Sequence, residues 1–180
     1  MEAAGRSPDT LIACSATDRG RSPVPDPWRA RGSMGRARTL LVSINDDFLD
    51  GVADWVADDA RIEVVGRAHH GSQALQRAGS LRAELVLVDV TLPDMSGFEF
   101  ARRIKSRPGA PLVVLLSFHD SNAARVEARA AGADGFVSKS EMADRLLPLI
   151  GDLLRQRISS AREKIPGFPT LRVPPTNVSK

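Results

Sequence analysis

The sequence predicts an α/β fold built on one parallel sheet. Five short apolar segments, rich in β-branched residues, alternate with five segments whose apolar residues recur at helical spacing. The third short segment, Leu85–Val88, is apolar throughout, which is typical of a strand buried on both faces. Strands that alternate with helices in this way form a parallel sheet with right-handed crossovers, so that helices cover both of its faces.

Each element is expected from local signals, beginning at Thr39. The expected strands comprise residues 39–44, 62–66, 85–88, 112–116 and 135–137. The expected helices comprise residues 48–56, 74–78, 98–106, 123–131 and 141–162. Within the first helix, Phe48, Val52 and Trp55 recur at i, i+4 and i+7, which assigns Trp55 to core packing.

Proline and glycine mark the breaks between these elements. Pro93 and Gly97 separate the third strand from its helix, and Pro111 leads into the fourth strand. Gly132 follows the fourth helix as a C-terminal cap.

The last helix carries an apolar arc that is wider than packing on one sheet requires. Its apolar residues spread over about half of the circumference, against a stripe of roughly 100° for a helix packed on one face. We expect the middle of the arc to face the core and one edge to stay partly exposed. The middle comprises Leu146, Ile150 and Leu153, and the edge comprises Leu147, Leu154 and Ile158. The exposed edge predicts a homodimer or a protein partner docked on the C-terminal helix.

Composition indicates one soluble domain with tails. The chain has 180 residues, of which 42% are hydrophobic and 26% charged, enough for a core and a solvated surface. No apolar run approaches the roughly 18 residues of a membrane span, and the N-terminus lacks the apolar centre of a secretory signal. Cys14 is the only cysteine, which excludes a disulfide framework and a thiolate metal site. We therefore expect a cytoplasmic protein with no membrane contact.

The positive charge lies in the tails. Residues 1–38 hold seven Arg against four acids, and residues 152–180 hold six Lys and Arg against two acids. Because the whole chain carries +3, the block between them is mildly acidic. We predict a disordered basic arm over residues 1–37 and a flexible tail over residues 163–180, solvated rather than bound to nucleic acid. Met34 is an alternative start, under which the residues before it would not be translated.

Asp89 is the first candidate functional residue. It directly follows the buried third strand, where the carboxyl edge of a parallel sheet gathers ligands and reactive groups. An acid at this place can also cap a helix or form a structural ion pair. The strand pattern alone leaves these alternatives open.

Residues 38–154 resemble the receiver domain of response regulators in two-component signalling, of the subgroup that a helix-turn-helix output domain usually follows. The resemblance rests on five motifs in family order and at family spacing. They are Val64-Val65-Gly66, Leu85-Val86-Leu87-Val88-Asp89, Leu92-Pro93-Asp94-Met95-Ser96-Gly97, Ser117-Phe118-His119-Asp120 and Ala131-Gly132-Ala133-Asp134-Gly135-Phe136-Val137-Ser138-Lys139. It implies a flavodoxin-like receiver fold over residues 38–162 with sheet order 2-1-3-4-5. In that order the ends of four strands surround one pocket.

The resemblance also implies roles for residues at this pocket. Asp89 takes the position of the family's phosphoacceptor, and Ser117 and Lys139 take the positions that contact the phosphoryl oxygens. Ser117 and Phe136 match the pair of switch residues that respond to the phosphate. Asp89 and the backbone carbonyl of Thr91 match two ligands of the family's Mg²⁺ ion.

The departure from the family lies at the end of the first strand. A gap-free alignment puts Ser43 and Ile44 where receivers carry two adjacent acids that hold Mg²⁺. Asp46 follows closely, but its use as a ligand needs a slip that breaks the register of the first helix. Mg²⁺ prefers octahedral oxygen ligation through one or two carboxylates and waters, which Ile44 cannot supply.

Two functions of different class therefore remain. In one, Asp89 accepts a phosphoryl group from a histidine kinase or a phosphotransfer protein, and output passes through protein contacts. In the other, the chain is a pseudo-receiver, an interaction module that depends on neither Mg²⁺ nor phosphorylation.

Other motifs predict little chemistry. The chain has no nucleophile elbow, phosphate-cradling glycine loop or Cys/His cluster, so we expect no enzymatic activity. The residues after position 151 are too few for a DNA-binding domain, which we do not expect. His69 and His70 are expected in a polar loop away from the pocket, and His119 as a solvated residue.

Overall fold

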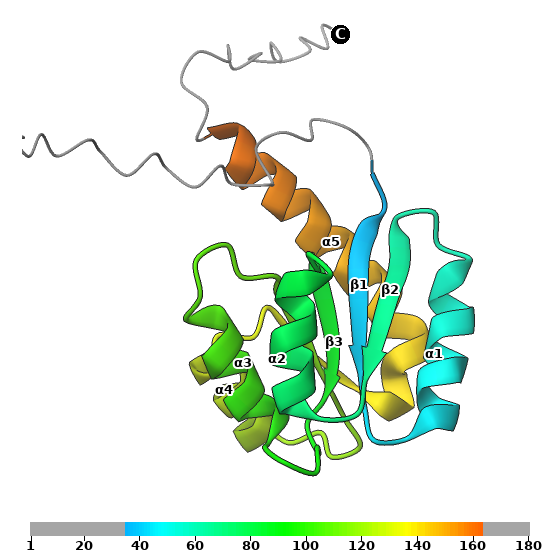
Figure 1. Ribbon diagram of the computed structural model, residues 1–180, viewed down its shortest axis with the longest axis vertical. Helices are drawn as coiled ribbons and strands as arrows, with labels where there is room; N and C mark the ends of the chain where they lie inside the picture. The colour runs from blue at the N-terminus through cyan, green and yellow to red at the C-terminus, as the bar shows by residue number, and fades with distance from the viewer. Residues whose placement is uncertain (1–34, 164–180) are drawn as a thin grey trace, which may run out of the picture.

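The computed structural model describes residues 35–163, which form a five-stranded parallel sheet with helices on both faces (Figure 1). The strands are β1 (Ala37–Val42), β2 (Ile62–Ala68), β3 (Leu85–Asp89), β4 (Leu112–Ser117) and β5 (Gly135–Ser138). The helices are α1 (Asp46–Ala57), α2 (Gly71–Ser80), α3 (Gly97–Lys105), α4 (Asn122–Ala130) and α5 (Met142–Glu163), with a 3₁₀ turn η1 (Lys139–Glu141) before α5. The strand order is β2-β1-β3-β4-β5, which confirms the expected fold class and topology.

Some boundaries differ from expectation. β1 begins at Ala37, which the sequence assigned to the arm, and ends at Val42, so that Ile44 lies beyond the strand. β2 continues past Gly66 to Ala68, which pairs with Val42. The register shifts between Thr39 and Leu40, where Val65 of β2 is left without a partner in β1. The predictions made for residues 1–34 and 164–180 lie outside the described residues. No described helix is long and apolar enough to cross a membrane.

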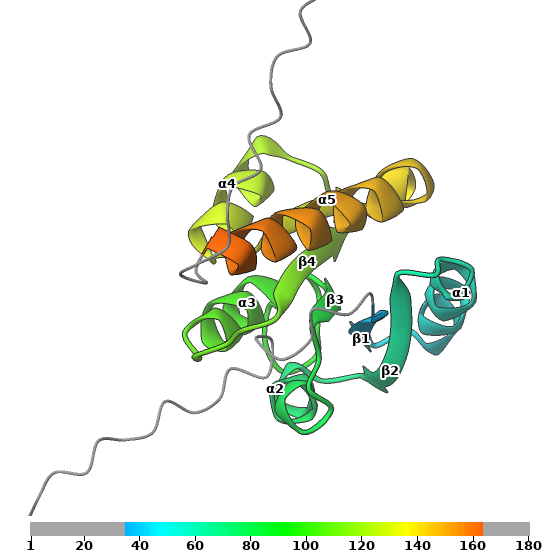
Figure 2. The same cartoon turned by 90° about the horizontal axis from the view of Figure 1, so that it is seen from above.

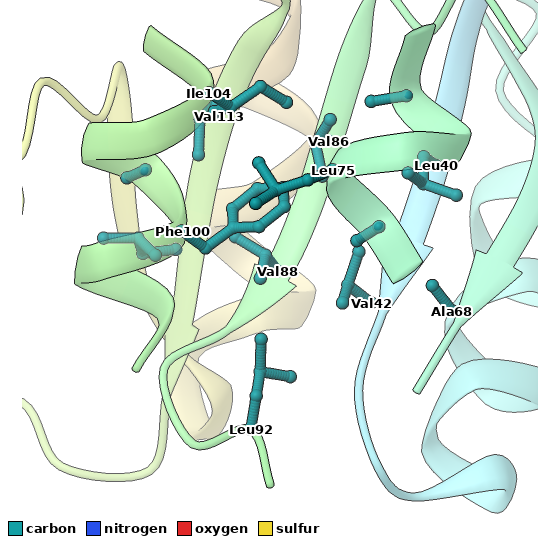
Figure 3. Packing of buried hydrophobic residues seen from close by; sticks show 14 of the residues in the cluster. Leu40, Val42, Ala68, Leu75, Val86, Val88, Leu92, Phe100, Ile104 and Val113 are labelled. Atoms are coloured by element: carbon teal, nitrogen blue, oxygen red, sulfur yellow. The ribbon is translucent and has the colours of Figure 1, made fainter. Parts of the chain in front are cut away.

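Two apolar layers hold the helices on the sheet. One face of the sheet packs against α2, α3 and α4, and the other packs against α1 and α5 (Figure 2). Phe100 of α3 is fully buried in the first layer, where its ring lies among Leu75, Val86 and Val88 (Figure 3). Trp55 packs at the margin of the second layer, partly buried, in line with its expected structural role.

Local contacts hold the connections after β1 and β3 close to the carboxyl edge of the sheet. Asn45 caps α1 by accepting a hydrogen bond from the Phe48 amide at 2.9 Å. Gly97 begins α3 so close to β3 that a Cβ atom there would lie 2.5 Å from the Asp89 carbonyl oxygen. Only glycine permits this approach, which brings the N-terminus of α3 against the end of β3.

Helix α5 has the predicted arc. Leu146 and Ile150 are fully buried and Leu153 nearly so, whereas Leu147 and Leu154 are half-buried and Ile158 is 56% exposed. The middle of the arc therefore faces the core and one edge does not, as expected.

Candidate functional site

The centre of the carboxyl edge is an ion pair between Asp89 and Lys139. Asp89 ends β3, and Lys139 follows β5 directly, so the sheet brings together two residues that are fifty positions apart. Lys139 Nζ lies 2.5 Å from Asp89 Oδ2, and the two side chains are only 5% and 10% exposed. Each of these two charges is stabilised by the other, because a buried charge without a counter-ion is costly.

Ser43 is the second partner of Asp89. The β1–β3 register pairs Val42 with Val88, so the next residue of β1 comes level with Asp89. Ser43 is fully buried, and its hydroxyl donates to Asp89 Oδ2 at 3.2 Å while it accepts from the Asn45 amide at 3.3 Å. Oδ2 thus receives both an ammonium and a hydroxyl, whereas Oδ1 accepts a long hydrogen bond from the Thr91 amide at 3.4 Å.

Two phenylalanine rings lie over the Lys139 ammonium group. Nζ is 3.9 Å from the centroid of Phe48 and 4.5 Å from that of Phe118. Phe118 lies over the ammonium group although this residue is 75% exposed. Ring faces attract a cation, so both rings interact favourably with the ammonium group. The sequence analysis missed this contact, since Phe48 fitted the helix stripe and Phe118 counted only as part of a motif.

Ser117, expected to contact the phosphoryl group, is bonded within its own loop. Its hydroxyl donates to the His119 carbonyl at 3.0 Å and accepts from the His119 amide at 3.1 Å. Phe136, the other expected switch residue, is half-buried, and the guanidinium of Arg125 lies 5.5 Å from its ring centroid. Arg125 also binds Asp120, and this hydrogen bond lowers the pKa of the Asp120 carboxyl.

Ile44 and Asp46, which follow Ser43, have other surroundings than Asp89. Ile44 is 59% exposed, and Asp46 reaches to within 3.5 Å of His69 Nε2. His69 Nδ1 lies 3.2 Å from the Ser43 carbonyl oxygen. The expectation that His69 lies away from the pocket was therefore wrong. The extension of β2 to Ala68, paired with Val42, brings the next residue level with Ser43 at the pocket rim.

The donor set of the pocket does not fit Mg²⁺. Asp89 supplies a carboxylate, but one oxygen of that group already binds Lys139 and Ser43. Among residues 35–163, no group of three or more His, Cys, Asp or Glu side chains could hold a metal ion. Mg²⁺ requires near-octahedral oxygen ligation, usually with one or two free carboxylates and several waters.

The loop after β3 is fixed by Asp94. Its two carboxylate oxygens accept from the Gly71 amide at 2.8 Å and from the Ser72 amide at 2.9 Å, at the N-terminus of α2. These bonds, that from Ser72 first, lower the pKa of Asp94 to about 2. The loop that frames one side of the pocket is thereby tied to the neighbouring helix.

Known proteins with similar sequences carry the same type of domain. The family model described as "Response regulator receiver domain" matches residues 40–150. A protein-glutamate methylesterase/protein-glutamine glutaminase of Nocardioides sp. is 32% identical over 137 residues, which cover 69% of this chain and 37% of that protein. The DNA-binding transcriptional activator DevR/DosR of Mycobacterium tuberculosis is 31% identical over 102 residues, 57% of this chain and 47% of the relative. This chain thus spans less than half of either protein.

Solved structures agree on the fold. A two-component response regulator of the LuxR family from Aurantimonas sp. matches with a TM-score of 0.63 and 26% identity, over 72% of this chain and 99% of that one. The response regulator domain of Thermotoga maritima CheB matches with a TM-score of 0.54 and 22% identity, over 73% and 99% of the two chains, a likeness of fold alone.

Proposed function

The chain belongs to the response regulator receiver domain family, and we propose that it works as a pseudo-receiver, an interaction module that needs neither Mg²⁺ nor phosphorylation. The observation that carries this proposal is the hydrogen bond from Ser43 to Asp89, in a pocket where the Asp89 carboxylate is already paired with Lys139. The neighbouring Ile44 presents an apolar side chain to solvent where an acid would be needed.

The chemistry of phosphoryl transfer supports this proposal. A carboxylate attacks an anionic phosphoryl donor against charge repulsion, so the pocket has to neutralise the charge that builds up on the oxygens. Without a divalent ion several kcal/mol of that stabilisation are lost. Lys139 could supply one positive charge, but it is already neutralised by Asp89 and lies under two rings.

Phosphorylation of Asp89 is the second candidate function. It is favoured by the position of Lys139 Nζ, 2.5 Å from Asp89 Oδ2, within reach of a group bound to that carboxylate. Ser117 ends the neighbouring strand β4 and would have to leave the His119 backbone to donate to the same group. In this alternative the partner would be a histidine kinase or a phosphotransfer protein, and the switch would be Ser117 with Phe136.

One experiment separates the two functions. The protein would be incubated with acetyl phosphate and Mg²⁺, and the gain of a phosphoryl group would be followed by intact mass. We expect no labelling of the wild type, and labelling of the Ser43→Asp/Ile44→Asp variant, which regains two acids. Asp89→Asn in that background is the matched control and should abolish labelling. Wild-type labelling at the rate of the double variant would overturn the pseudo-receiver proposal and establish Asp89 as the phosphoacceptor.

In either case output would pass through protein contacts. We propose the edge of α5 formed by Leu147, Leu154 and Ile158 as the contact surface for a protein partner or a second copy. Replacing Leu154 and Ile158 by Glu should abolish the contact without unfolding the domain, because neither side chain is fully buried. Sedimentation velocity and circular dichroism on the same samples would read out both effects. Unchanged association in the folded double variant would exclude this edge.

A further inference from the structure

A cavity of about 190 Å³ lies at the edge of the sheet where β3 and β4 begin, opposite the Asp89 pocket. One wall comes from the end of α2 and the residues after it, between positions 78 and 83. The other wall comes from the end of α3 and its connection to β4, between positions 104 and 111. The two helices cover the same face of the sheet (Figure 2). The Leu112 amide joins the two connections by donating to the Glu84 carbonyl at 2.9 Å.

The interior of the cavity is apolar, and the charges around it are positive. Ile104, Ala78 and Ala83 are buried residues of its lining. The charged residues of the lining are Arg82 and Arg107, both exposed. A cavity of roughly 150 Å³ takes a benzene ring, whereas sites for cofactors and drug-sized molecules usually measure about 300–1,000 Å³. The space therefore suits one large apolar side chain of another protein better than a cofactor.

Both arginines keep donors for an anion. Arg107 Nη1 donates to the Leu75 carbonyl at 2.6 Å, so this side chain reaches from the α3–β4 connection to α2. A guanidinium has five N–H donors, and this carbonyl takes one of them. Among residues 35–163, no carboxylate pairs with Arg107, and the Arg82 guanidinium makes no hydrogen bond or ion pair. A carboxylate can bind a guanidinium through two parallel hydrogen bonds, which makes it the matching partner.

The backbone of Arg82 is left-handed, with a φ of 49°. This conformation is unfavourable for a residue with a Cβ atom, and among residues 35–163 no other non-glycine residue has a positive φ. The conformation ends α2, because the Ala83 amide donates to the Ala78 carbonyl at 2.9 Å and the Arg82 amide to the Gly79 carbonyl at 3.1 Å. The chain thus places an arginine where glycine fits best.

Helix α4 ends in the same pattern and has glycine at this position. Gly132, with a φ of 79°, donates to the Arg129 carbonyl at 2.9 Å. Glycine adopts this backbone without strain. The dipole of α2 does not require Arg82 either, since Arg77 already lies in the last turn. The guanidinium of Arg82 is therefore not needed to end the helix, and its place on the cavity wall points to a ligand.

We propose that this cavity binds a short acidic segment of a partner protein. One Phe or Leu side chain enters the cavity, and acids on either side of it bind Arg82 and Arg107. An apolar anchor beside an arginine is a frequent combination at the centre of protein interfaces. Both tails of this chain carry an excess of Lys and Arg, so their charge does not complement the site. The cavity is at the opposite edge from Asp89, and the proposal does not rest on how that pocket works.

An NMR titration with a capped peptide tests the proposal. The probe is Asp-Glu-Phe-Glu-Asp, added to the isotope-enriched full chain. We expect the methyl signals of Ile104 and the guanidinium signals of Arg82 and Arg107 to shift together and to saturate, with a dissociation constant of about 1 mM or tighter. A peptide with Ala in place of Phe should bind about tenfold more weakly, because it leaves the cavity empty. A peptide with Asn and Gln in place of the acids should also bind more weakly.

The Arg82→Gly variant separates binding from structure. It removes the guanidinium and relieves the unfavourable backbone, so the melting temperature should change little while the affinity for the peptide falls about tenfold. Arg129→Gln is the matched control, because it removes an exposed arginine from the last turn of α4, which does not line the cavity. This control should bind the peptide as tightly as the wild type.

Three results would overturn the proposal. The first is a titration in which the Ile104 methyl signals do not shift. The second is equal affinity for the peptide that lacks Phe, which would make the arginines a simple anion site. The third is an affinity that is unchanged in Arg82→Gly, or that falls equally in Arg129→Gln, which would assign the contact to overall charge. Labelling of Asp89 by acetyl phosphate, which should be the same in Arg82→Gly and wild type, reports on the proposed function separately.

Discussion

The Asp89 pocket and the loop after β4 lie at the same edge of the sheet but are held by different kinds of contact. In the pocket, a buried ion pair receives a buried hydroxyl and two covering rings. In the loop, Ser117 binds the backbone of His119, and Asp120 pairs with Arg125 at the surface. Phe118 of this loop lies against the pocket, with its ring over the Lys139 ammonium group. The side-chain contacts of the two regions meet at this ring, while the pairing of Asp89 with Leu116 and of Ser117 with Ser138 joins their backbones.

This difference bears on how a signal could pass from one region to the other. A receiver that responds to phosphate needs its hydroxyl switch residue to respond to the phosphoacceptor. Here the Ser117 hydroxyl has both a donor and an acceptor within its loop, so a move towards Asp89 has to break two hydrogen bonds. Breaking each hydrogen bond costs about 1 kcal/mol net. A fixed interaction module does not need this rearrangement.

Removing one charge of the pocket should have the largest effect. Lys139→Met leaves Asp89 buried without its counter-ion, and we expect a loss of about 3–5 kcal/mol in the free energy of unfolding. Urea denaturation measures this loss. The Asp89→Asn/Lys139→Met double variant is the control, and it should be more stable than Lys139→Met alone because no unpaired charge remains. A Lys139→Met variant as stable as wild type would contradict the view of the pocket as a structural ion pair.

The cap of α2 should come next, and it makes stability depend on pH. The pKa of Asp94 is lowered to about 2 in the folded protein, from an ordinary value of 3.8. Its contribution is therefore complete above pH 3.8 and is lost as the pH falls from there towards 2. Asp94→Asn should remove about 1 kcal/mol of capping free energy at pH 7 and so lower the melting temperature. At pH 2.5 the melting temperature should fall by less. An equal loss at both pH values would exclude the charge as the cause.

Parts of this site could be anticipated from the sequence. Asp89 and Lys139 each follow a strand, and parallel strands end at one edge, so their proximity follows from topology. The partners of His69 could not be anticipated, since they depend on the register shift at Val65 between β1 and β2, which no local pattern encodes. The contact of Phe118 with Lys139 also escapes prediction, because an exposed ring after a strand has many possible neighbours.

Loss of the Phe118 ring should have a smaller effect on stability. Phe118→Ser removes one of the two rings over Lys139, and a cation–π contact at an exposed site is worth about 0.5–1 kcal/mol. Urea denaturation should show a loss of this size. Labelling by acetyl phosphate should stay absent, because the missing acids and not the ring limit the chemistry. If Phe118→Ser alone allowed labelling, the ring would be a lid on a competent pocket, and the comparison of the two regions would need revision.

The smallest effect on stability should come from the ion pair of the loop, and it tests the separation of the two regions most directly. Asp120→Ala frees Arg125, whose guanidinium lies over the ring of Phe136. Surface ion pairs contribute little, so the free energy of unfolding should be almost unchanged.

The ring signals of Phe136 should shift in NMR spectra, while the ammonium signal of Lys139 should not. Glu127→Ala is the matched control, because Glu127 lies on the same helix as Arg125 but pairs with Arg102 of α3. A shift at Lys139 in Asp120→Ala but not in Glu127→Ala would show that the loop and the pocket are coupled after all, which would favour Asp89 as part of a working switch.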